Sequence, residues 1–161
     1  ARRILIVENR SDPGNLGVLI RTALGFGFDL ILLAGENVDP YNPKVVRASA
    51  GAIFGVTLMD SSYDQIKSLK SRINLRLLAA DLQGESESRW KLDGQNQKGS
   101  ETNAPLALAV GAESVGVSEE LLGLADQRLR ISHSARLESL NAAMAAGIIM
   151  HQMSLVNDRR E

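Results

Sequence analysis

The sequence predicts an α/β protein in which helices cover both faces of a parallel sheet, and three observations lead to this fold class. Short apolar segments rich in Val, Ile and Leu alternate with segments whose apolar residues recur at helical spacing. The strand candidates are apolar along their whole length, which is typical of parallel strands buried on both faces. Neither a repeat nor a linker divides the 161 residues, so we expect a single domain over residues 1–161.

The first half of the chain is expected to form three strand–helix pairs. The strands are RILIVE (3–8), FDLILLA (28–34) and VTLMD (56–60). The helices that follow them lie in LGVLIRTALGFG (16–27), NPKVVRASAGAIFG (42–55) and SSYDQIKSLKSR (61–72). Glycines end the first helix, a proline stands near the start of the second, and Ser or Asp caps the third.

The second half is expected to hold three more strands and two helices around one long loop. The strands are NLRLLAAD (74–81), PLALAVG (105–111) and QRLRI (127–131). Residues 83–104 are polar and rich in Gly, Ser and Asn, and they predict an exposed loop. SEELLGLAD (118–126) predicts a short capped helix, and the last helix is expected from about Leu137 to about Asn157.

The composition excludes several classes of protein. The chain has no cysteine, which excludes disulfides, thiolate zinc sites and cysteine nucleophiles. Its net charge of −1 means that any RNA contact needs a local basic patch or another domain, and 4% aromatic residues argue against a base-stacking platform. No apolar run is long enough to span a membrane, and no signal-peptide pattern is present.

Two expectations follow about the location and extent of the chain. We expect a cytoplasmic protein, or an organellar one if a transit segment has been removed. A strand-like segment begins directly after Ala1, so we also expect that an amino-terminal RNA-binding extension is missing from this chain.

Ligands of open α/β sheets bind beyond the carboxyl ends of the strands, and the first unusual loop of this kind covers residues 8–23. Asn15 is a candidate cap or turn residue, and Arg21 lies inside an otherwise apolar helix. Gly17 shares a helix face with Arg21 and leaves room there for a ligand or a backbone. The alternative is structural: Asn15 is an N-cap, and Arg21 extends to solvent.

Two further loops carry polar residues beside apolar elements. VGAESVGVSEELL (110–122) places Gly111, Glu113 and Gly116 directly after a strand, without a dinucleotide-binding or Walker pattern. LESLNAAMAAGIIMHQM (137–153) begins a buried helix with Glu138, Ser139 and Asn141, which is more than an N-cap requires. The alternatives are a plain turn in the first case and ordinary helix capping in the second.

These three segments resemble the three motifs of the SpoU/TrmH family of SPOUT-class RNA 2′-O-ribose methyltransferases. The first is similar to N-x-G-x-x-x-R-x-A, with Asn15, Gly17, Arg21 and Ala23. The second is similar to G-[S/T/N]-E-x-x-G-[L/V/I], with Gly111, Glu113, Gly116 and Val117. The third is similar to E/D-S-L-N followed by small residues, with Glu138, Ser139, Leu140, Asn141 and Ala145. RASAGAIFGV (47–56) also resembles a family segment, whereas Ala112 and Ser132-His133 depart from the usual pattern.

The resemblance implies a fold, an activity and an assembly. The fold is a parallel α/β sheet whose carboxyl-terminal segment forms a deep trefoil knot, which sequence physics alone would not suggest. The activity is methyl transfer from S-adenosylmethionine (AdoMet) to a ribose 2′-hydroxyl of rRNA or tRNA. The implied assembly is a homodimer with its active site near the subunit interface, with no metal ion and no membrane association.

The resemblance also implies roles for individual residues. The implied catalytic residues are Arg21, Asn15, Glu113, Ser139 and Asn141. Arg21 would bind a phosphate or stabilise charge, since a guanidinium is a poor base. The implied cofactor-binding residues are Val110, Gly111, Ala112, Glu113, Gly116, Ile131, Ser132, Leu140, Asn141 and Ala145.

Other functions stay open at this point. A knotted module could bind RNA or AdoMet without catalysis, or the acceptor could be a base atom. A nicotinamide-dependent enzyme is disfavoured because no G-x-G-x-x-G follows the first strand. His133 and His151 have no partner that the sequence identifies, and we assign them no role.

Overall fold

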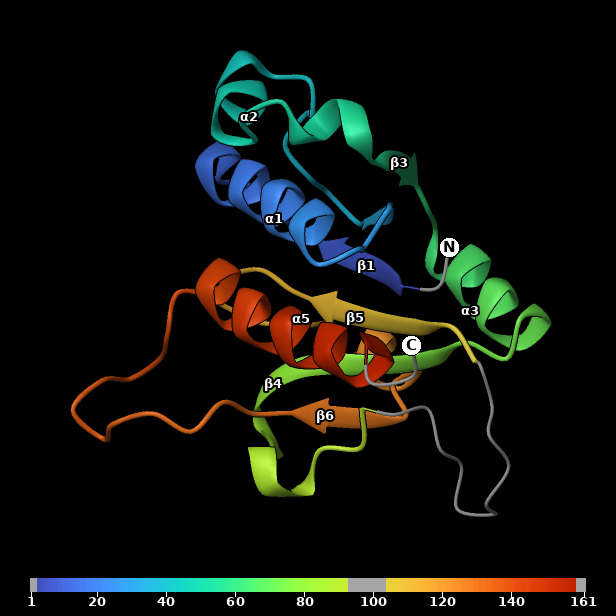
Figure 1. Ribbon diagram of the computed structural model, residues 1–161, viewed down its shortest axis with the longest axis vertical. Helices are drawn as coiled ribbons and strands as arrows, with labels where there is room; N and C mark the ends of the chain where they lie inside the picture. Colours follow the sequence, from blue (N-terminus) through green and yellow to red (C-terminus); the bar gives the residue numbers. More distant parts are fainter. Residues whose placement is uncertain (1–2, 93–103, 159–161) are drawn as a thin grey trace.

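The computed structural model describes residues 3–92 and 104–158, and it contains one six-stranded sheet (Figure 1). The strand order is β3–β2–β1–β5–β4–β6, and every neighbouring pair is parallel. The strands are β1 (Arg3–Glu8), β2 (Leu30–Ala34), β3 (Thr57–Asp60), β4 (Arg76–Glu85), β5 (Leu106–Val110) and β6 (Gln127–Leu129). The predicted parallel α/β sheet is therefore confirmed.

Helices cover both faces of this sheet, as the sequence predicts. One face carries α1 (Pro13–Gly25), α2 (Pro43–Ala48), the short 3₁₀ helix η1 (Ala52–Gly55) and α5 (Ala142–Asp158). The other face carries α3 (Tyr63–Arg72) and α4 (Glu119–Leu122). None of the helices in the described ranges is long and apolar enough to cross a bilayer.

The central strands separate two apolar cores because their side chains alternate between the faces. Along β1, Leu5 and Val7 pack on the side of α1 and α5, whereas Ile4 and Ile6 pack on the side of α3 and α4. All four side chains are at most 1% exposed. Burial on both faces explains why these strands are apolar throughout their sequence.

The strand order reverses between β1 and β5, and this is where a ligand crevice is expected in an open α/β sheet. The chain leaves β1 towards α1 on one face and reaches α4 on the other face after β5. Buried Glu8, the last residue of β1, links this strand to α3 and to the start of α4, which cover the same face of the sheet. Its carboxylate accepts hydrogen bonds from the Tyr63 hydroxyl at 2.6 Å and from the Ser118 backbone N–H at 2.8 Å. The bond to Glu8, followed by burial, raises the pKa of Tyr63.

Gly17 lets α1 approach the backbone of α2. A Cβ built on Gly17 would lie 2.7 Å from the Val45 carbonyl oxygen and still closer to the Ala48 side chain. The space that the sequence suggested for a ligand or a backbone is therefore filled by the backbone of α2.

Two expected boundaries are wrong. The last helix begins at Ala142, not near Leu137, because Glu138 and Ser139 belong to an exposed, non-helical segment before it. The loop expected over 83–104 is partly regular: β4 continues to Glu85, the 3₁₀ helix η2 spans Glu87–Arg89, and Leu92 is buried in the core. The rest of that expectation, residues 93–103, lies outside the described residues.

Glu87, in the segment after β4, is hydrogen-bonded to Ser132 in the loop that follows β6. The Glu87 carboxylate accepts two hydrogen bonds from Ser132, one from the backbone N–H at 2.6 Å and one from the hydroxyl at 2.7 Å. The Arg130 N–H donates to the Glu85 carbonyl at 2.8 Å. The pKa of Glu87 is held below 4.5, first by its own backbone N–H and then by the Ser132 hydroxyl.

Gly17→Ala is expected to destabilise the protein although alanine is the better helix former. The added methyl group collides with the backbone of α2, and overpacking of this kind costs about 1–3 kcal/mol. Gly25→Ala is the matched control, because a Cβ there meets no atom within 4 Å. Chemical denaturation measures both variants, and a Gly17→Ala protein as stable as wild type would contradict the packing argument.

Glu87→Gln is expected to lower the melting temperature at neutral pH. Because the folded state depresses the pKa of Glu87, its stabilisation is present above 4.5 and is lost as the pH falls through the folded value. The two melting curves should therefore converge in acid. Ser132→Ala removes one of the two donors and should give a smaller loss with the same pH dependence. A difference between wild type and Glu87→Gln that persists unchanged below the folded pKa is the contrary result.

Candidate active site

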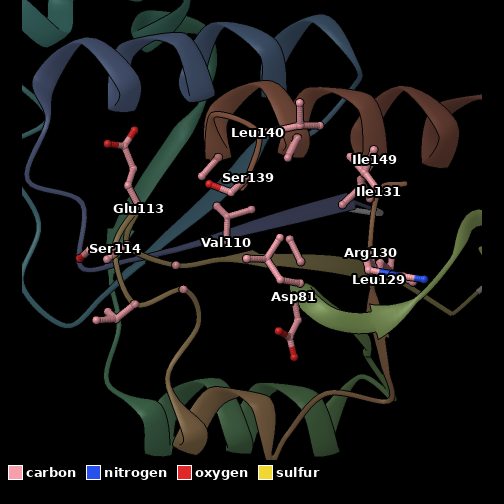
Figure 2. A pocket seen from close by; sticks show the side chains of 18 of the residues that line it. Asp81, Val110, Glu113, Ser114, Leu129, Arg130, Ile131, Ser139, Leu140 and Ile149 are labelled. Carbon is pink, nitrogen blue, oxygen red and sulfur yellow. The ribbon is translucent and has the colours of Figure 1, made fainter. Parts of the chain in front are cut away.

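A pocket opens at the carboxyl ends of β4, β5 and β6, on the edge where an α/β sheet is expected to bind its ligand (Figure 2). About 870 Å³ in and over it is free of protein atoms, part of it open to solvent. The walls are mainly apolar and include Val110, Leu129, Leu140 and Ile149.

Most of the expected cofactor-binding residues line this pocket. They are Val110, Gly111, Ala112, Glu113, Gly116, Ile131, Leu140 and Ala145. Ser132 and Asn141 do not line it: Ser132 is bonded to Glu87, and Asn141 faces a separate groove between α1 and α5. Contact of these residues with a cofactor stays a prediction.

The pocket also has walls that the sequence analysis missed. They include Ala80, Asp81 and Leu82 in the second half of β4, Leu129 and Arg130, and His133. The Asp81 carboxylate lies 3.6 Å from the guanidinium of Arg128 in β6. The sequence signals these wall residues only through the predicted parallel sheet. Because β4 and β6 are parallel to β5, their carboxyl ends meet at one edge of the sheet.

The second-motif loop over residues 111–117 owes its shape to two glycines. Gly116 has a φ of +70°, and its N–H donates to the Ala112 carbonyl at 2.8 Å. A Cβ on Gly111 would overlap the backbone of Gly116 and Val117. The backbone of the same loop therefore fills the space beside Gly111.

Asn15, Glu113 and Asn141 converge beside the pocket, although the three motifs are far apart in sequence. Glu113 Oε1 accepts a short hydrogen bond from Asn15 Nδ2 and a longer one, 3.4 Å, from Asn141 Nδ2. The same Asn141 amide lies 3.3 Å from Asn15 Oδ1. Each of the three side chains therefore contacts the other two.

Asn141 both caps the last helix and contacts Glu113 and Asn15, while its functional role stays a prediction. Its Oδ1 accepts a hydrogen bond from the Met144 N–H at 3.1 Å, while its Nδ2 faces Glu113 and Asn15. Ser139 is not a cap: it lines the pocket next to Leu140, on the segment before α5 (Figure 2). Asn15 is not a cap either, because Asp12 accepts the hydrogen bond of the Asn15 N–H at 2.9 Å and caps α1.

Arg21 does not enter the pocket of its own chain. It is exposed on α1, and it is not among the residues that line the pocket in the described part of the protein. It shares the outer face of that helix with Val18, which is 44% exposed. The catalytic role expected for Arg21 stays a prediction, and within one chain it has no geometric support.

The two histidines differ in position. His133 lines the pocket, with Nδ1 3.1 Å from the Ile131 carbonyl oxygen. His151 is exposed on α5 and meets Phe26 edge to face, with ring centroids 5.4 Å apart. Among the described residues, no group of three or more His, Asp or Glu side chains is arranged to hold a metal ion.

Comparison with proteins of known sequence supports the resemblance. The chain is 32% identical to an uncharacterised tRNA/rRNA methyltransferase of Synechocystis over 94% of its length. It is 31% identical to the 23S rRNA (guanosine(2553)-2′-O)-methyltransferase RlmP of Bacillus subtilis over 95% of its length. The chain spans about half the length of these curated relatives, 53% and 58% respectively.

Solved structures show the same architecture. The AdoMet-bound rRNA methyltransferase of Sinorhizobium meliloti matches 95% of this chain with a TM-score of 0.81 and 29% identity, over 56% of its own length. The SpoU methyltransferase AviRb of Streptomyces viridochromogenes, also solved with AdoMet, matches 97% with a TM-score of 0.82 and 25% identity, over 60% of its own length. The model of the SpoU rRNA methylase family matches residues 2–151, and the chain belongs to this family.

Proposed function

We propose that this protein transfers the methyl group of AdoMet to a ribose 2′-hydroxyl of rRNA or tRNA. The observation that carries the proposal is the contact of Asn15, Glu113 and Asn141 at the rim of an apolar pocket. The choice of ribose is supported by the B. subtilis relative, whose name states 2′-O-methylation. A 28% identical structure described as an RNA 2′-O ribose methyltransferase, with a TM-score of 0.77, supports it as well.

The pocket residues fit AdoMet. Val110, Ile131 and Leu140 offer apolar walls for an adenine ring, and backbone groups of the surrounding loops can read its edge. Asp81 and Glu113 place carboxylates at a site that would take a cationic cofactor. When bound, AdoMet would supply an activated methyl group carried on a sulfonium.

The polar cluster would act on the acceptor. A ribose hydroxyl is a weak nucleophile, so its lone pair has to be aimed and its proton has to leave during transfer. Asn15 and Asn141 would hold the hydroxyl and the sugar, with Glu113 fixing both amides. Ser139, on the pocket wall, would orient the same sugar.

Arg21 would complete the site from the other subunit of a homodimer. The groove between α1 and α5 has exposed apolar side chains at its rim, with Val18 44% exposed and Met144 63% exposed. A second copy covering this face would bury them and bring Arg21 to the interface. There its guanidinium would bind an RNA phosphate and stabilise the negative charge that the acceptor oxygen gains as its proton leaves.

The deep trefoil knot is proposed on the family resemblance and on the return path of the chain. After β6, at the edge of the sheet, the chain comes back as α5, which packs on α1 and β5 (Figure 1). The connection between β6 and α5 lines the pocket with Ile131, His133 and Ser139. Such a path would draw the second and third motifs around one ligand.

Arg21→Ala is expected to keep AdoMet affinity within about twofold of wild type, because Arg21 does not line the pocket of its own chain. Methylation of rRNA or tRNA transcripts should fall more than roughly tenfold, a barrier increase above about 1.4 kcal/mol. Calorimetric titration and transfer of a radiolabelled methyl group measure the two effects. Arg72→Ala, at the end of α3 on the opposite face, is the control. A wild-type rate for Arg21→Ala would exclude its proposed role, and methylation of bases alone would exclude the ribose assignment.

Met144→Glu is expected to convert a dimer into monomers, because it places a charge in the proposed apolar interface. Light scattering after size-exclusion chromatography measures the mass. Met59→Glu, at an exposed position of β3, should leave the dimer intact. The interface is wrongly placed if Met144→Glu has the wild-type mass.

A further inference from the structure

The largest side chain that the fold buries completely is a charged one, Arg10. It follows β1 and is 1% exposed. Its backbone is held by the loop after β2, with the Arg10 N–H donating to Asn37 Oδ1 at 2.9 Å and the Val38 N–H donating to the Arg10 carbonyl at 2.7 Å. By contrast, the buried Nε, Nη1 and Nη2 of its guanidinium have no hydrogen-bond partner among the described residues.

A buried guanidinium without hydrogen bonds is costly, so its charge needs to be balanced nearby. Burial lowers the pKa of Arg10, while the carboxylates of Glu113 and Asp12 oppose that effect. Glu113 is the ion-pair partner, with Oε1 3.7 Å from Arg10 Nη1. This distance is too long for a hydrogen bond but short enough for a Coulombic attraction, which solvent at the half-exposed Glu113 weakens in part.

The oxygen that faces Arg10 is the one that holds the candidate active site together. Glu113 Oε1 also accepts the hydrogen bonds of Asn15 and Asn141. The Glu113 side chain is 47% exposed, so solvent competes for its carboxylate. Arg10 is fixed by its burial and by its backbone contacts, and so its charge attracts the carboxylate from a constant position.

We propose that Arg10 is a positioning residue whose buried charge holds the Glu113 carboxylate against Asn15 and Asn141. The inference rests on the proposed function for its catalytic consequence, but the ion pair itself does not. Arg10 is 1% exposed and borders a small second cavity with Asp12, Glu113 and Ser114. It is not expected to touch AdoMet, because it does not line the pocket proposed for that cofactor.

Removing the charge of Arg10 and removing the charge of Glu113 should have unequal effects on the stability of the fold. Arg10→Met removes the charge and leaves Glu113 half-exposed and able to hydrate, so the fold should tolerate it. Glu113→Gln leaves the buried Arg10 without its partner and should lower the melting temperature by at least ~3 °C. In the Arg10→Met background, Glu113→Gln should cost little, because no buried charge is left to balance.

The experiment is a double-mutant cycle on the whole chain, read by melting temperature and by single-turnover methylation. Arg10→Met should lower the methylation rate at least tenfold and change AdoMet affinity less than twofold. Arg10→Lys, which restores a cation, should recover most of that rate. Lys70→Met removes the ion pair of Lys70 with Asp126, remote from the pocket, and should leave methylation unchanged.

The outcomes separate this inference from the proposed function. Equal effects of Glu113→Gln in both backgrounds would overturn the ion pair, whether or not the protein methylates RNA. Glu113→Gln could lower the melting temperature more in wild type than in Arg10→Met while Arg10→Met methylates at the wild-type rate. This result would overturn the positioning role and leave the proposed function intact. If the wild-type chain methylates no RNA, the proposed function fails, and the melting-temperature cycle alone decides whether Arg10 holds Glu113.

Discussion

One carboxylate oxygen, Glu113 Oε1, joins segments that the chain otherwise keeps apart. It meets an amide from α1 and an amide from the start of α5, which are 98 and 28 residues away in sequence, and it faces the buried guanidinium of Arg10. Everything proposed for the site depends on this convergence, since none of the three motifs forms a pocket alone. The convergence in turn depends on the parallel pairing of β1 with β5, which aligns the ends of the two strands.

Local rules were enough to predict most of the fold. The strands are apolar runs because both of their faces are buried, α3 has the expected serine cap, and α1 ends at an expected glycine. The start of α1 was predicted wrongly, because the helix begins at Pro13 with Asp12 as its cap and not near Asn15. The predicted start of α5 was wrong because Leu137 and Leu140 continue the helical spacing of apolar residues. The chain instead uses this stretch as a wall of the pocket, and Asn141 begins the helix. Spacing cannot distinguish an apolar residue that packs in a helix from one that lines a cavity.

The candidate site was predicted less completely than the fold. Glu113, Asn15 and Asn141 stand out because polar residues beside apolar elements are unusual, and they do meet. Ala80, Leu82 and Leu129 line the pocket without any sequence signal, because an apolar wall residue resembles a core residue. Arg10 was missed for the opposite reason: an arginine just after a strand ordinarily reaches solvent, and only the three-dimensional structure shows it enclosed.

The hydrogen bonds between Glu87 and Ser132 make the position of the loop after β6 depend on the first part of the connection between β4 and β5. The polar composition of that connection does not indicate this dependence. Polar connections of this kind ordinarily tolerate insertions and deletions, because little of the protein depends on their path. Here the first part of the connection supports the loop carrying Ile131 and His133, both of which face the pocket. A change in the length of residues 85–92 would therefore shift Ile131 and His133, and with them one wall of the pocket.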